Sequence, residues 1–208
     1  MGVPQKAVAY IEIDDYLVLE NASRYKHEYL DGVIYAIQGV AVRGMAGGSQ
    51  VHARIIRNLG FALHSKLKDS PCEVLGSDMR LRIDDDAVFY PDVLVHCQSA
   101  LQPASQLVNT TELTDARLVA EVLSPTTQVF DRGAKLAAYQ RLPGLQHIVL
   151  LSGMEQAAWS CHRDAEGQWG KLQTWSRDTA LALHGLGLGL GLGLEVGWAE
   201  VYEGVGLA

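Results

Sequence analysis

Two stretches decide the fold: FYPDVLVHC at residues 89–97 and LVAEVLSP at residues 118–125. Each is an apolar run, typical of a strand in the centre of a sheet that helices cover on both faces. Each also contains a single acid, Asp92 in the first stretch and Glu121 in the second. An ionised carboxylate in a buried strand is costly unless something pairs with it. The sequence therefore raises the question of what these two acids are paired with.

The rest of the chain alternates helical and extended patterns around these two stretches. Apolar spacing and end signals predict helices over about 10–22, 49–68 and 131–141. Further strands are predicted at 27–30 and 33–38 around the turn Asp31-Gly32, at 72–83 with a break at Gly76, at 146–152, and in a hairpin formed by AAWSCHR and KLQTWS. This order predicts an α/β (α+β) fold with a central mixed β-sheet flanked by α-helices.

The remaining segments are predicted to lie at the surface. Residues 98–116 are polar and predict a loop, and the repeat GLGLGLGLGL at 185–194 predicts a connector or a loose edge strand. The sequence EVGWAEVYEGV that follows predicts a short closing helix. A chain of 208 residues fits a single domain, with a core over about 10–160 and a C-terminal hairpin and Gly-Leu tail over 161–208.

Composition narrows the class of protein. Hydrophobic residues make up 48% and charged residues 20%, which is a globular composition, and no run of 18 apolar residues predicts a membrane span. The three cysteines, Cys72, Cys97 and Cys161, are widely spaced and form no CxxC pair, so we expect no disulfide framework and a cytoplasmic location. A net charge of −7 argues mildly against broad, non-specific DNA binding.

The two acids can form one cation site. If the strands that carry Asp92 and Glu121 are neighbours, their carboxylates converge, and two close carboxylates need a shared proton or a cation between them. Mg²⁺ or Mn²⁺ takes such oxygen ligands, and the carbonyl of Val122 is a natural third one. The alternative is that each acid is satisfied separately by backbone donors or a helix N-terminus.

Three further residues are candidates for the same site. Lys135 follows Asp131 by one helical turn, so it either points at the carboxylates, where it would position a water or stabilise charge, or forms a weak surface pair with Asp131. Glu28 reaches the cluster if its hairpin packs beside the sheet, and otherwise is a solvated strand acid. His52 opens the helix at 49–68 and faces either a phosphate or solvent.

The same residues resemble a known family. HEYLDGVIYAI, the His52 helix start, LGSDMRLRI, YPDVLV, LVAEVLSPTT and DRGAKLAAYQRL are together similar to the Uma2 family of nucleases, once classed as a domain of unknown function. The resemblance covers about residues 10–160. It implies a restriction-endonuclease-like PD-(D/E)xK core and a Mg²⁺-dependent phosphodiesterase site with Asp92 and Glu121 as metal ligands.

The resemblance also has departures. The nuclease pattern places a lysine two positions after the glutamate, where this chain has Leu123, so Lys135 on the next helix is the candidate replacement. The predicted function is a Mg²⁺-dependent endonuclease acting on DNA, and nucleases of this fold often pair, which predicts a homodimer by analogy. The alternatives are a catalytically inactive module that binds nucleic acid or a protein, and a metallo-phosphatase acting on a small molecule.

Overall fold

The computed structural model describes residues 10–37, 49–97, 110–184 and 193–207. The helical elements are α1 (Ile13–Ala22), α2 (Gln50–Leu67), α3 (Gln128–Phe130), the π-helical turn η2 (Asp131–Lys135), α4 (Leu136–Tyr139) and α5 (Trp198–Tyr202). The strands are β1 (His27–Leu30), β2 (Val33–Ala36), β3 (Cys72–Gly76), β4 (Arg80–Asp84), β5 (Ala87–Phe89), β6 (Val93–Cys97), β7 (Glu112–Leu113), β8 (Leu118–Leu123), β9 (His147–Ser152), β10 (Ala158–His162), β11 (Gln173–Trp175), β12 (Leu181–Leu183) and β13 (Leu194–Val196). This mixture confirms the α+β class.

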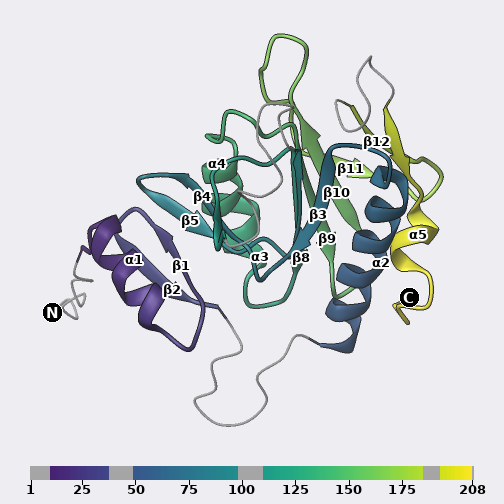
Figure 1. The fold of residues 1–208 in the computed structure, drawn as a ribbon. Coiled ribbons are helices and arrows are strands. Elements are labelled where there is room, and N and C mark those ends of the chain that lie inside the picture. Colours follow the sequence, from purple (N-terminus) through teal and green to yellow (C-terminus); the bar gives the residue numbers. More distant parts are fainter. Residues whose placement is uncertain (1–9, 38–48, 98–109, 185–192, 208) are drawn as a thin grey trace, which may run out of the picture.

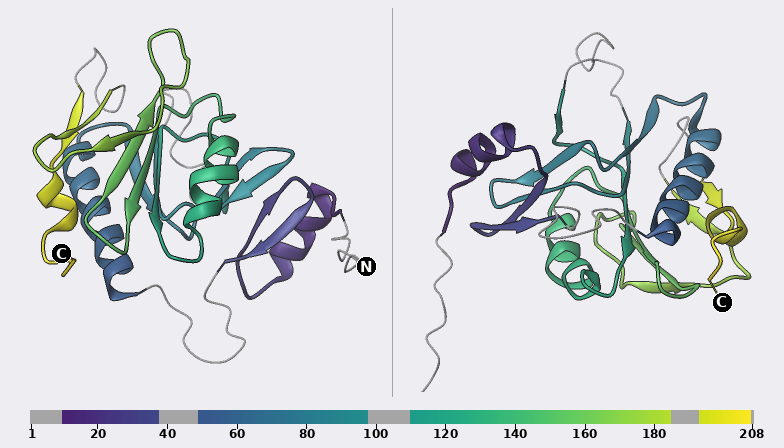
Figure 2. Two further views of the ribbon diagram at one scale, coloured as in Figure 1. Left: turned by 180° about the vertical axis from the view of Figure 1, so that it is seen from behind. Right: turned by 90° about the horizontal axis from the view of Figure 1, so that it is seen from below.

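The strands form two large sheets and a separate hairpin. One sheet has the order β2-β1-β5-β4-β7, the other has the order β11-β10-β9-β8-β6-β3, and β12 pairs with β13. Helices α2 and α5 lie on one side of the six-stranded sheet, and α4 lies on its other side, toward the strands of the five-stranded sheet (Figure 1). Figure 2 shows the same arrangement from behind and from below. The predicted mixed sheet with flanking helices is therefore present, divided into two.

The strand that follows Asp92 and the strand that carries Glu121 are neighbours. β6 pairs antiparallel with β8, and β8 pairs parallel with β9. All six residues of β8 are buried, because helices cover both faces of the sheet. Alternation along β8 sends Ala120 and Val122 toward α2, whereas Val119 and Leu123 face α4. Glu121 shares the second face, so its carboxylate points toward the helix that carries Lys135.

The stretch 89–97 is not one strand. β5 ends at Phe89 in the five-stranded sheet, and β6 begins at Val93 in the six-stranded sheet, so the predicted continuous strand is wrong at its centre. Pro91 lies between them and has no N–H to donate to a sheet ladder. The break places Asp92 at the junction of the two sheets, in front of β6.

Two other predicted segments differ from the structure. The helix predicted over 131–141 begins earlier, at Gln128, and contains the π-helical turn η2. Part of the predicted loop at 98–116 is a strand, because β7 pairs parallel with β4 through Arg80 and Glu112. Residues 98–109 of that segment and residues 185–192 of the Gly-Leu repeat lie outside the described part of the chain.

The cysteine prediction is wrong for two of the three residues. Cys72 and Cys97 stand directly opposite each other in the β3–β6 ladder and form a disulfide with a Cα–Cα distance of 3.9 Å, while Cys161 is free and buried. Their separation of 25 residues did not predict the disulfide, because the two cysteines meet only through the antiparallel register of β3 and β6. Disulfides are rare in reducing cytosol, so the cysteines no longer support the predicted cytoplasmic location. None of the described helices is long and apolar enough to cross a bilayer.

Candidate active site

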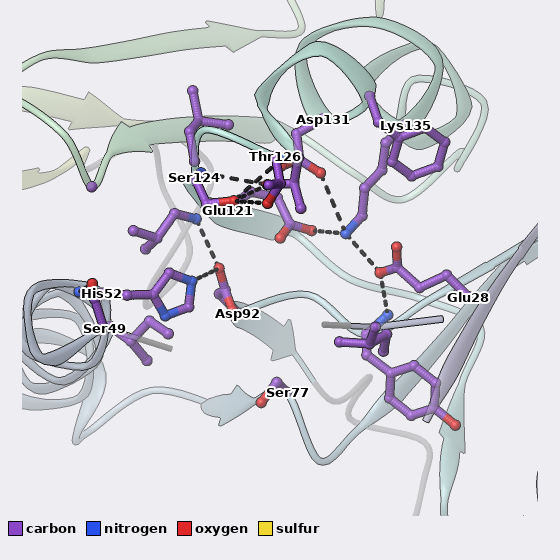
Figure 3. Close-up of a pocket in the computed structure, with 18 of the residues that line it drawn as sticks. Glu28, Ser49, His52, Ser77, Asp92, Glu121, Ser124, Thr126, Asp131 and Lys135 are labelled. Carbon is purple, nitrogen blue, oxygen red and sulfur yellow. Dashed lines mark hydrogen bonds and ion pairs between the residues drawn. The ribbon is translucent and has the colours of Figure 1, made fainter. Parts of the chain in front are cut away.

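Lys135 is buried between carboxylates. Its side chain is 5% exposed, and its Nζ lies 2.8 Å from Glu121 Oε1, 2.7 Å from Glu28 Oε1 and 4.0 Å from Asp131 Oδ1 (Figure 3). The alternative that Lys135 forms only a surface pair with Asp131 is therefore wrong. The lysine points inward from its helix and contacts the glutamate of β8.

The helix that carries Lys135 is adapted to this position. Residues 131–135 form the π-helical turn η2, and such turns often occur at functional sites. One turn further on, Tyr139 donates a hydrogen bond of 2.5 Å from its hydroxyl to the same Oε1 of Glu121. Two donors thus hold one oxygen of Glu121.

Glu28 reaches the cluster from the N-terminal hairpin. β1 pairs antiparallel with β5, so the hairpin packs beside the strand that precedes Asp92. The backbone N–H of Tyr90, which follows β5, donates to Glu28 Oε1 over 3.3 Å, and Lys135 donates to the same oxygen. The hairpin therefore packs beside the sheet, which is the condition under which Glu28 was expected to join the cluster.

Asp92 is held from two sides. Its Oδ2 accepts a hydrogen bond of 2.8 Å from the N–H of Val122 and lies 3.3 Å from Nε2 of His52. Ser49 caps α2 by accepting from the N–H of His52, which fixes that histidine in the first turn of the helix. Figure 3 shows His52 and Asp92 on one side of the group, with Lys135 and Glu28 on the other.

Burial and charge oppose each other at this site. Burial raises the pKa of Glu121, with Lys135 acting in the opposite direction, and burial likewise raises the pKa of Asp131. Burial alone would lower the pKa of Lys135, but Glu121, Glu28 and Asp131 together raise it above its usual range. The hydrogen bond to Asp92 raises the pKa of His52, against the effect of burial.

These residues line a cleft with a volume of about 980 Å³. Its lining includes Glu28, Asp92, Glu121 and Asp131 with Lys135 and His52, and the hydroxyl-bearing residues Ser124, Thr126 and Thr127 lie at its edge. Four carboxylates thus line the cleft, and the basic side chains that contact them in the described part of the chain are Lys135 and His52. This excess of buried negative charge is the condition under which a site takes up a proton or a metal cation.

The donor set fits Mg²⁺ or Mn²⁺ of the kind held by few protein ligands. No group of three or more His, Cys, Asp and Glu side chains among the described residues is arranged to hold a metal ion. Mg²⁺, however, is commonly bound by one or two carboxylates and keeps several waters. Asp92, which directly precedes β6, and Glu121 on the neighbouring strand β8 line the same cleft and supply two such carboxylates, and the carbonyl of Val122 belongs to the same strand as Glu121.

Sequence reasoning named most of this group and missed part of it. The structure brings Glu28, Glu121 and Lys135 into direct contact and places Asp92 in the same cleft. The contact of Tyr139 with Glu121 was missed, although the spacing D-x-x-x-K-x-x-x-Y signals a shared helical face. The contact of His52 with Asp92 was also missed, since the two residues lie forty positions apart.

Three comparisons connect the chain to known proteins. The family model Uma2, described as "Putative restriction endonuclease", matches residues 13–196. In Synechocystis, the "Uncharacterized protein slr1290" is 34% identical over 75% of this chain and 76% of its own length, and the "Uncharacterized protein sll1609" is 33% identical over 66% and 72%. The crystal structure of "a putative nuclease belonging to DUF820" from Anabaena variabilis superposes with a TM-score of 0.70, at 17% identity, over 94% of this chain and 99% of that one.

Proposed function

This chain belongs to the Uma2 family, and we propose that it is a metal-dependent endonuclease that hydrolyses phosphodiester bonds in DNA. The observation that carries the proposal is the buried lysine of the cleft, which bridges two carboxylates beside a third. If the same acids and lysine lay on the surface, they would form an ordinary exposed salt bridge. Buried together in a cleft, they form the kind of group found at sites of acid, base and metal chemistry.

Asp92 and Glu121 would hold the cation, with the carbonyl of Val122 as a third ligand. The N–H of Val122 fixes one oxygen of Asp92, and Lys135 and Tyr139 fix one oxygen of Glu121. Each carboxylate therefore has a fixed orientation and a second oxygen for a ligand. A bound Mg²⁺ would polarise a phosphate oxygen and lower the pKa of its water.

Lys135 supplies the positive charge that remains in the protein. Its Nζ is compact, buried and already desolvated, so it interacts strongly with negative charge that develops nearby. In the DNA-bound cleft it would orient the attacking water or stabilise the charged phosphate. Leu123 occupies the position of the usual lysine and is 1% exposed in the core, so the helix provides the amine that the strand does not.

His52 acts as a positioning residue in this proposal. Its Nε2 contacts the oxygen of Asp92 that also accepts from the backbone, which leaves the other carboxylate oxygen for the cation. This is the arrangement in which outer partners orient a metal ligand, and loss of such a partner typically weakens metal affinity 10- to 100-fold. A homodimer, with one site for each DNA strand, stays a prediction.

The alternative is a nuclease-fold module that binds nucleic acid or protein without cutting. Two observations favour it: Leu123 replaces the lysine of the nuclease pattern, and the chain carries a net charge of −7. In that case the carboxylates and Lys135 would form a structural ion network. The alternative requires binding that does not depend on a divalent cation.

Cleavage of supercoiled plasmid DNA with Mg²⁺ or Mn²⁺ separates the two functions. The wild-type chain should nick or linearise the plasmid, and Asp92→Asn and Glu121→Gln should each lose activity by more than the roughly 10²–10³-fold that one lost electrostatic group costs. Asp84→Asn is the matched control, because Asp84 is an acid paired with Arg141 outside the cleft. Equal cleavage by wild type, Asp92→Asn and Glu121→Gln would refute the proposed site.

A further inference from the structure

One wall of the cleft is aromatic. Tyr35 and Phe130 line it with their ring centroids 4.8 Å apart and their planes inclined by 32°. Phe130 packs in turn against the buried Phe89, whose ring centroid lies 6.4 Å away. Tyr35 remains 37% exposed. Phe130 is therefore supported by a buried ring, and the ring of Tyr35 is accessible at the edge of the cleft.

Strand register places this wall beside the charged group. Tyr35 on β2 stands directly opposite Glu28 on β1, and opposed residues of an antiparallel pair share one face of the sheet. Glu28 contacts Lys135 at 2.7 Å, and Phe130 immediately precedes Asp131. Tyr35 is thus the cross-strand partner of one member of the carboxylate–lysine group, and Phe130 is the sequence neighbour of another.

The cleft has few cations that a DNA duplex could use. Among its described lining residues, the cationic side chains besides Lys135 and His52 are Lys26 and Arg57. Lys26 is already engaged by Asp78 and by the carbonyl of Ser77. Duplex binding depends on neutralising many phosphates, whereas single strands gain much of their affinity from bases stacked on aromatic rings.

We propose that the cleft binds an unpaired stretch of nucleic acid, with one base stacked on the Tyr35–Phe130 pair and the adjoining phosphodiester at the group around Lys135. The proposal rests on the proposed nuclease function and narrows its substrate to polynucleotide with an unpaired stretch, which negatively supercoiled plasmid DNA also exposes. A volume of about 980 Å³ lies at the upper end of ordinary ligand pockets, which suits a short run of nucleotides. Arg57, across the cleft on α2, would contact a flanking phosphate.

Binding can be measured without cleavage by using the full chain with Glu121→Gln. Fluorescence anisotropy would compare labelled single-stranded DNA, single-stranded RNA and duplex DNA, each about 12 nucleotides long and so within the span of known single-strand sites. We expect either single strand to bind more tightly than the duplex. With about two phosphate contacts, the slope of log affinity against log salt should be roughly −1 to −2.

Substitution of Tyr35 tests the stacking. Tyr35→Ala and Tyr35→Leu should each weaken single-strand binding by about 5- to 150-fold, the range that base–aromatic stacking gives, and Tyr35→Trp should retain it. Tyr35→Leu keeps an apolar strand residue without the ring. Tyr25→Ala is the matched control, because Tyr25 is 55% exposed and lies outside the cleft lining.

Duplex binding as tight as single-strand binding, or unchanged binding in Tyr35→Ala and Tyr35→Leu, would overturn this inference. Duplex DNA cleavage that is equally fast with Tyr35 and with Tyr35→Ala, both measured with Glu121 in place, would also overturn it. That result would leave the proposed nuclease function intact. Single-strand binding that depends on Tyr35, with no cleavage under any divalent cation, would support the inference and count against the nuclease function.

Discussion

The two ends of the paired strands β8 and β9 bury titratable side chains in opposite ways. At one end, Glu121 lies in a group with Glu28, Asp131 and Lys135. At the other end, where Leu118 pairs with His147, the buried His147 lies beside the exposed His162 and His184, and within the described residues no ion pair joins these histidines to an acid. Their ring centroids are 5.9 Å apart for His147 and His162 and 6.1 Å apart for His162 and His184.

The difference shows how the partner decides the state of a buried group. Burial lowers the pKa of His147 to about 4, and its Nε2 donates to the carbonyl of His184 over 2.7 Å, as a neutral imidazole can. Lys135 is equally buried, but the carboxylates around it raise its pKa and keep it charged. A buried titratable residue without an opposite charge becomes neutral, whereas Lys135 keeps its charge because carboxylates surround it.

Removal of the lysine should break the charged end most severely. Lys135→Met leaves Glu28 and Glu121 buried without their cation, which costs about 3–5 kcal/mol of unfolding free energy for a buried pair. Adding Glu121→Gln to Lys135→Met should recover part of that loss, because one uncompensated charge is removed. Urea unfolding of the wild type, Lys135→Met, Glu121→Gln and the double variant measures the coupling free energy between the two residues. Strictly additive changes in unfolding free energy would show that they are not coupled.

The neutral end should respond to acid. The pKa of His147 is about 4 in the folded chain, against 6.5 for an ordinary histidine, so below about pH 6.5 the unfolded chain binds a proton that the folded chain excludes. Stability is therefore lost as pH falls through this window, by about 3 kcal/mol at its lower end. Urea unfolding across this pH range should show a shallower loss in His147→Gln. An unchanged pH profile would mean that His147 is not neutral.

The charged end should respond to pH in the opposite direction. Burial raises the pKa of Glu121 above its unfolded value, so the stabilising contribution of its protonated form is lost as pH rises through the folded pKa. Without metal, the unfolding midpoint of the wild type should fall as pH rises from about 4.5 to about 8, by about 2–4 °C for each kcal/mol. Glu121→Gln should flatten this fall, and a profile equally steep in the variant would contradict the assignment.

The sequence predicted the architecture where the pattern was local. Period-two alternation, the Asp31-Gly32 turn and the amphipathic pattern of α2 each depend on neighbours in the chain, and all appear in the structure. The break at Pro91 was missed because FYPDVLVHC is apolar on both sides of Pro91-Asp92, and apolarity does not distinguish one long strand from two strands in different sheets. The Cys72–Cys97 pair was missed because it depends on the register between strands.

The site was predictable in its members but not in its contacts. Asp92 and Glu121 could be named from their positions in apolar strands, and Lys135 and Glu28 from the elements that would bring them alongside. The inward direction of Lys135 could not be fixed, because its helix contains a π-helical turn. The roles of these four residues remain predictions. The contact between Asp92 and His52 depends on how α2 docks against β6, which no local pattern reveals.

Calorimetric titration of the metal-free protein with Mg²⁺ and Mn²⁺ tests the central claim most directly. The account predicts one binding event in the wild type, its loss in Asp92→Asn and in Glu121→Gln, and its persistence in Asp84→Asn, with all four proteins folded. Unchanged cation affinity in both Asp92→Asn and Glu121→Gln would contradict it, because the two buried acids would then hold no metal.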